Sequence, residues 1–119
     1  MNRQYDIEER LIQFAVGVCH LANTLPSSRV GYHIAGQLVR SGTSPAANYA
    51  EAQGAESRRD FVHKMRICLK ELRETLVWLK LVRRLGLDRH TVMDGTVKEV
   101  NELISIFVRS IRTAQRGSN

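Results

Sequence analysis

Apolar residues recur along most of this chain at alternating steps of three and four positions, the spacing that keeps side chains on one side of an α-helix. The longest such run spans 57–85 and contains neither Gly nor Pro. Its apolar seam consists of Phe61, Met65, Cys68, Leu72, Thr75, Leu79 and Val82. Ser57 followed by Asp60 resembles an N-terminal capping box, and Gly86 stands where a C-terminal stop belongs. The pattern predicts a helix of about 43 Å at ~1.5 Å per residue.

Two further segments repeat the pattern at the ends of the chain. The first has Asp6 as its expected cap and ends at Pro26, with apolar positions Ile7, Leu11, Phe14, Ala15, Val18, Ala22 and Leu25. The last follows a short link over 87–90, with the seam Met93, Val97, Val100, Ile104, Phe107, Ile111 and Ala114. Both segments are therefore predicted to be amphipathic helices.

A segment rich in small residues lies between the first of these helices and the central one. We expect one kinked helix from about Ser28 to Gln53, because Pro45 removes a backbone donor in its middle. The alternative is a helix that restarts near Ser44, with Pro45 in its first turn. Four helices with short links predict one all-α domain over residues 1–119, an antiparallel up-down-up-down four-helix bundle.

Composition narrows the classes of function. Cys19 and Cys68 occupy apolar helical positions, so we interpret both as reduced thiols. Asp60 and His63 form a single Asp-x-x-His pair, which falls short of a di-metal site, and we expect no metal and no cofactor. No Ser–His–acid grouping is evident, so an enzyme is not expected. The charged N-terminus and the absence of a long apolar run favour a cytoplasmic protein that does not enter membranes.

Positive charge is concentrated on the central helix. It carries nine Lys or Arg and three acidic residues, which accounts for the whole net charge of +6. We define the basic stripe as the residues that share one side of this helix: Arg59, Arg66, Lys70, Arg73, Lys80 and Arg84. It is predicted to lie opposite the seam. The stripe is either a solvated helix face or a surface that binds the phosphates of a nucleic acid. No aromatic residues are interleaved with it, so the sequence gives little support for stacking on bases.

Two further groups of residues need an explanation. A third face of the central helix carries the apolar residues Ile67, Trp78, Leu81 and Leu85, which we interpret as a subunit interface, the alternative being packing within the monomer. A polar motif surrounds Pro45 and consists of Arg40, Ser41, Ser44, Asn48 and Glu51. Its hydroxyls and the Asn48 amide can form hydrogen bonds with backbone groups that lose their partners around Pro45. A binding role for the same residues stays open.

Three stretches of the sequence resemble a known family. They are QLVRSGTSPAANYAEA at 37–52, SRRDFVHK at 57–64 and KELRETLVWLKL at 70–81, with IFVRSIRTA at 106–114 also similar. The chain resembles the bacterial four-helix-bundle proteins encoded in ribosomal-RNA intervening sequences, which are distantly similar to accessory proteins of diversity-generating retroelements. The resemblance implies a ring-shaped homopentamer. In the distant relatives the pentamer binds nucleic acid and a reverse transcriptase.

These observations together predict a non-enzymatic, homo-oligomeric bundle that binds RNA or DNA without sequence specificity through the basic stripe. The alternative is a protein–protein assembly module, or an accessory subunit for an unidentified protein, that binds no nucleic acid. A third and weaker alternative is a small-molecule or metal site inside the bundle or ring.

Overall fold

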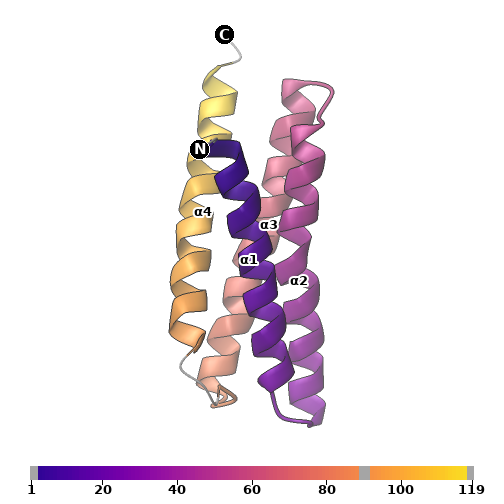
Figure 1. Cartoon of the computed structure of the whole chain (residues 1–119), viewed down its shortest axis with the longest axis vertical. Helices are drawn as coiled ribbons and strands as arrows, with labels where there is room; N and C mark the ends of the chain where they lie inside the picture. Colours follow the sequence, from indigo (N-terminus) through magenta and orange to yellow (C-terminus); the bar gives the residue numbers. More distant parts are fainter. Residues whose placement is uncertain (1–2, 89–91, 118–119) are drawn as a thin grey trace.

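The computed structural model describes residues 3–88 and 92–117 and contains four long helices (Figure 1). They are α1 (Arg3–Thr24), α2 (Arg29–Gln53), α3 (Arg58–Arg84) and α4 (Val92–Arg116). Each helix packs against the next one in the chain, and α4 returns to α1, which it contacts less extensively than it contacts α3. The helices alternate in direction, so the predicted antiparallel four-helix bundle is confirmed. Residues 89 and 90 of the predicted 87–90 link lie outside the described residues, as does residue 91.

The core runs the length of the bundle and follows the predicted seams closely. On α3 the buried residues are Val62, Met65, Cys68, Leu72, Thr75, Leu79 and Val82. Val62 therefore takes the place expected for Phe61, which is only partly buried. Leu21, Thr96 and Leu103 are also buried although the seams did not include them. A helix in a four-helix bundle contacts two neighbours, so its buried face is wider than a seam of two residues per heptad.

The helix ends of α3 match their sequence signals. Ser57 Oγ accepts a hydrogen bond of 3.0 Å from the Asp60 amide. At the other end, the amide of Gly86 bonds to the carbonyl of Arg83 and that of Leu87 to Val82, which is the Schellman pattern. Gly86 has a φ of +67°, a value that favours glycine. The expected cap at Asp6 is wrong, because α1 already begins at Arg3 and residue 6 lies inside the helix.

The second helix is continuous through Pro45, as preferred from its sequence. Close packing against α1 depends on a glycine, since a Cβ at Gly42 would lie 2.6 Å from Cγ1 of Val18. On the α3 side, the buried Thr75 Oγ1 lies 2.8 Å from the Glu71 carbonyl and 2.9 Å from Ser41 Oγ. The carbonyl can only accept, so Thr75 donates to it and the Ser41 hydroxyl donates to Thr75.

Candidate nucleic-acid interface

The basic stripe lies on the surface along almost the whole length of α3. All six of its side chains are exposed, and within the described chain none of them forms an ion pair. Arg59 and Arg66 line a depression together with Gln115 of α4 and the core residue Val62. The first half of the stripe is therefore turned toward α4, rather than lying directly opposite the seam as expected.

This depression, about 530 Å³ in volume, lies where α3 begins beside the last turns of α4. Its lining residues are Arg58, Arg59, Val62, His63, Arg66 and Gln115, and no carboxylate is among them. The same turns of α4 carry the exposed Arg112 and Arg116. Sequence reasoning missed these neighbours, because only the antiparallel packing of α3 on α4 brings the two segments to one end of the bundle.

Four cations outside the stripe are held by carboxylates: Arg10, Arg40, Lys64 and Arg83. Between α2 and α3, Arg40 bonds to Glu71 at 3.1 Å and to Glu74, whose other partner is the Trp78 indole N–H at 3.0 Å. Lys64 bonds to Glu51 at 3.1 Å, and this hydrogen bond raises the pKa of the Lys64 ammonium. Arg83 is paired with Asp94 across α3 and α4.

The polar motif around Pro45 is thus divided among several contacts. Arg40 and Glu51 join α2 to α3 through the ion pairs above. Ser41 is buried against Thr75. The Asn48 amide donates to the Ser44 hydroxyl at 2.8 Å and to the Ser44 carbonyl at 3.0 Å. Both hydroxyls of the motif therefore have partners other than a general base. Arg40, Ser41 and Glu51 join α2 to α3, whereas the contact between Ser44 and Asn48 lies within α2.

The apolar face of α3 is only partly covered. Trp78 is half-buried, packs against the core and meets the His33 ring edge-on at 5.9 Å. Ile67 is also half-buried, whereas Leu81 and Leu85 are 38% and 51% exposed. Packing within the monomer thus accounts for much of Trp78 but not for the two leucines. Sequence reasoning missed a second set of exposed apolar residues on α1 and α2, namely Ile12, Val16 and Val39.

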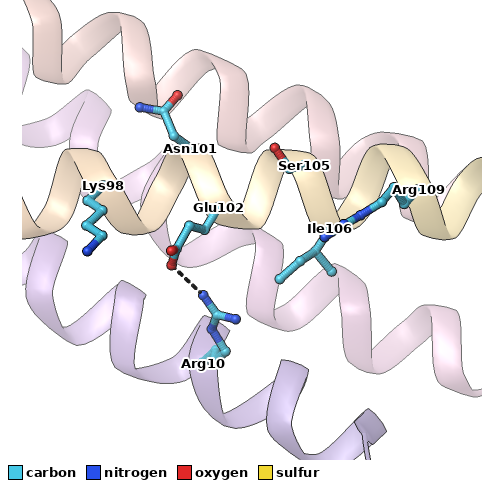
Figure 2. Close-up of a pocket in the computed structure, with 7 residues that line it drawn as sticks. All are labelled: Arg10, Lys98, Asn101, Glu102, Ser105, Ile106 and Arg109. Carbon is cyan, nitrogen blue, oxygen red and sulfur yellow. Dashed lines mark hydrogen bonds and ion pairs between the residues drawn. The ribbon is translucent and has the colours of Figure 1, made fainter.

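Another open depression, of about 520 Å³, lies between α1 and α4 (Figure 2). Figure 2 shows Arg10 of α1 reaching toward Glu102 of α4, at 3.1 Å, and its guanidinium also bonds to Glu99 at 2.7 Å. The hydrogen bond to Glu99 is the main cause of the raised pKa of Arg10. Because its charge is neutralised by two carboxylates, Arg10 joins the two helices and is a poor ligand for an anion.

Reactive and metal-binding groups are sparse in the part of the chain that the structure describes. No three His, Cys, Asp or Glu side chains there lie close enough together to hold a metal ion. Burial raises the pKa of the Cys68 thiol to about 12, so Cys68 is an inert core residue. No helix formed by the described residues has the length and apolar character needed to cross a membrane.

Comparison with known proteins places the chain in a family. The family model for the 23S rRNA-intervening sequence protein matches residues 3–109. A crystal structure of a protein of unknown function, from the S23 ribosomal protein family of Bacteroides thetaiotaomicron VPI-5482, is similar with 30% sequence identity and a TM-score of 0.84. The similarity covers 93% of this chain and 99% of that one. A search of curated proteins gave no match. The chain therefore belongs to the 23S rRNA intervening-sequence protein family.

Proposed function

We propose that the protein is a non-enzymatic homo-oligomer that binds RNA or DNA without sequence specificity through the basic stripe. One contrast carries the proposal. All six stripe residues are exposed on one helix and none forms an ion pair within the described chain, whereas Arg10, Arg40, Lys64 and Arg83 are each paired with a carboxylate. Other described cations without an ion pair, such as Arg29, Lys98 and Arg109, lie on other helices. Unpaired cations on a rigid helix are available to phosphates.

The geometry of the stripe suits a long polyanion better than a small ligand. Arg59, Arg66, Arg73 and Lys80 recur every seven residues, which places them about 10.5 Å apart along the helix at ~1.5 Å per residue. Assembly would multiply the charge: five copies, the number that the family resemblance implies, would carry five times +6, or about +30. No aromatic residue belongs to the stripe, so contacts to phosphates rather than to bases are expected.

A double substitution on the stripe tests the proposal. Arg66→Gln with Arg73→Gln should weaken binding to unrelated RNA and DNA sequences equally, and should flatten the log–log salt dependence by about one unit per lost contact per subunit. The matched control is Lys64→Gln with Arg83→Gln, which removes two charges from the same helix where carboxylates already hold them. Fluorescence anisotropy over a series of salt concentrations would measure both variants.

The control should bind nearly as well as the wild type, because its two cations contribute little to phosphate contacts. Equal loss in both variants would show that only total charge matters and that the stripe is not a site. Failure of the wild-type oligomer to bind any nucleic acid at low salt would sink the proposal.

A protein–protein assembly module is the second candidate function. It is favoured by the exposure of Leu81 and Leu85 on a helix that is otherwise strongly charged. In that case the partner is an acidic surface of another copy or of another protein, and the stripe pairs with it. The Arg66→Gln and Arg73→Gln variant would then lose its oligomer rather than its nucleic acid, which sedimentation would detect.

A further inference from the structure

At its N-terminal end, where α3 begins, the basic stripe borders a depression. Arg59, Val62, His63 and Arg66 follow the i, i+3, i+4, i+7 spacing, so they share one side of the first turns of α3. Arg58 lies near Gly117, just beyond the end of α4, and Gln115 of α4 also lines the depression. The result is a depression of about 530 Å³ rather than a convex helix surface.

The electrostatics of this depression favour an anion. Its lining holds three guanidinium groups and one imidazole but no carboxylate. The acidic residue of the first turn, Asp60, is not among the lining residues. The positive N-terminal end of α3 is offset by the negative C-terminal end of α4 beside it, so the attraction comes from the side chains rather than from helix dipoles.

We propose that this depression is a discrete binding site for a phosphate group that bears two or more negative charges. Guanidinium groups bind phosphate oxygens through paired N–H donors, and several of them around one concavity match a terminal phosphate better than an internal diester, which has a single charge. The volume leaves room for the group to which the phosphate is attached, with Val62 as an apolar wall.

Two sources supply such a phosphate: the end of a nucleic-acid strand and a free diphosphate. The first source rests on the function proposed above. It agrees with the layout of the surface, because Arg59 and Arg66 belong both to the depression and to the basic stripe. A strand held here by its terminal phosphate would continue along α3 toward Arg73 and Lys80.

The test compares one RNA sequence carrying a 5′-phosphate, a 3′-phosphate or hydroxyls at both ends. At moderate salt, we expect one phosphorylated end to bind about tenfold more tightly than the hydroxyl strand. Arg58→Gln with His63→Gln, which changes the depression outside the stripe, should abolish this preference and change the affinity for the hydroxyl strand less than about twofold. The matched control, Arg73→Gln with Lys80→Gln, should weaken all three strands and keep the preference.

Inorganic pyrophosphate, titrated at constant ionic strength, tests the second source. It should shift the NMR signals of the His63 ring in the wild type but not in a variant with Arg58→Gln and Arg59→Gln. Such a shift without any strand binding would support the anion site through a free diphosphate while overturning the proposed nucleic-acid function. Strand binding with no preference for phosphorylated ends and no pyrophosphate effect would overturn the anion site and leave that function standing.

Discussion

Two glycines of α2 show how differently the same residue contributes at two positions of one helix. At Gly42 the backbone lies against α1, and an added Cβ would lie 2.6 Å from Cγ1 and 3.0 Å from Cβ of Val18. Val18 is fully buried, and as a β-branched residue it has little rotamer freedom to move aside. Gly36 is exposed, and a Cβ there would meet nothing within 4 Å.

Alanine should therefore have opposite effects at these two positions. Gly42→Ala should destabilise the protein by about 1–2 kcal/mol, because overpacking outweighs the gain in helix propensity. Gly36→Ala should stabilise it by about 0.5–1 kcal/mol through that propensity alone. Urea unfolding of both variants would measure these changes. Stabilisation by Gly42→Ala as well as by Gly36→Ala would show that α1 and α2 are not packed closely at Gly42.

Cys68 should make the stability of the protein fall at alkaline pH. Its thiol ionises near its ordinary pKa of 9.0 in the unfolded chain and near 12 in the folded one. Between these values the folded state binds more protons, so the stabilisation is complete below pH 9 and is lost as the pH rises toward 12, by ~1.4 kcal/mol per pH unit. Cys68→Ala should flatten this decline, although its cavity lowers stability at every pH. If the free energy of unfolding of the wild type and of Cys68→Ala falls equally between pH 8 and pH 10, Cys68 is not the cause of the decline.

At the scale of the helices, the sequence pattern predicted the helices and their antiparallel arrangement, but not which residues of neighbouring helices meet. Repeats of three and four residues located α1, α3 and α4, and α2 was predicted from the segment rich in small residues between α1 and α3. Ser57 and Gly86 marked the two ends of α3. The spacing could not show that Val62 rather than Phe61 would be buried, since that choice depends on where α4 lies around α3. The depression at the start of α3 was not foreseen for the same reason: Gln115 is distant in sequence.

The contact between Arg40 and two glutamates is another feature that needs the register of two helices. Glu71 has only 13% of its side chain exposed, and Arg40 of α2 is its counter-charge. Arg40→Met should destabilise the protein by about 1–3 kcal/mol, because it leaves this carboxylate without a partner. Adding Glu71→Gln should recover part of the loss. Thermal unfolding of the single and double variants would measure this coupling.

Lys64→Met is the control for this pair, because it breaks a bridge of the same type to Glu51, whose side chain is 57% exposed. Water replaces the lost partner there, so the stability should change little. A loss as large as that of Arg40→Met would show that burial of the carboxylate is not the cause.

At the scale of the whole molecule, charged residues are distributed unevenly: most of α1 and nearly all of α2 carry few of them, whereas α3 and α4 carry many. Between Leu11 and Ala50 the only Asp, Glu, Lys or Arg residues are Arg29 and Arg40, and Arg40 is paired with α3. The exposed apolar residues Ile12, Val16 and Val39 therefore lie on stretches of α1 and α2 that carry few charges. Two copies that met through their basic stripes would repel, so assembly should use these residues together with Leu81 and Leu85.

A closed ring of identical subunits joins two different patches, one from each neighbour. Val16→Glu and Leu85→Glu should each yield monomers, because either change places a charge in every subunit contact. Mixing the two variants should restore dimers only, since each supplies the patch that the other lacks and the remaining contact carries both glutamates. Light scattering would measure the masses, with Val30→Glu, an exposed position on the side of α2 opposite Val39, as the control. If each patch instead met its own copy, each variant would still form dimers through its unchanged patch, and mixing the two would change nothing.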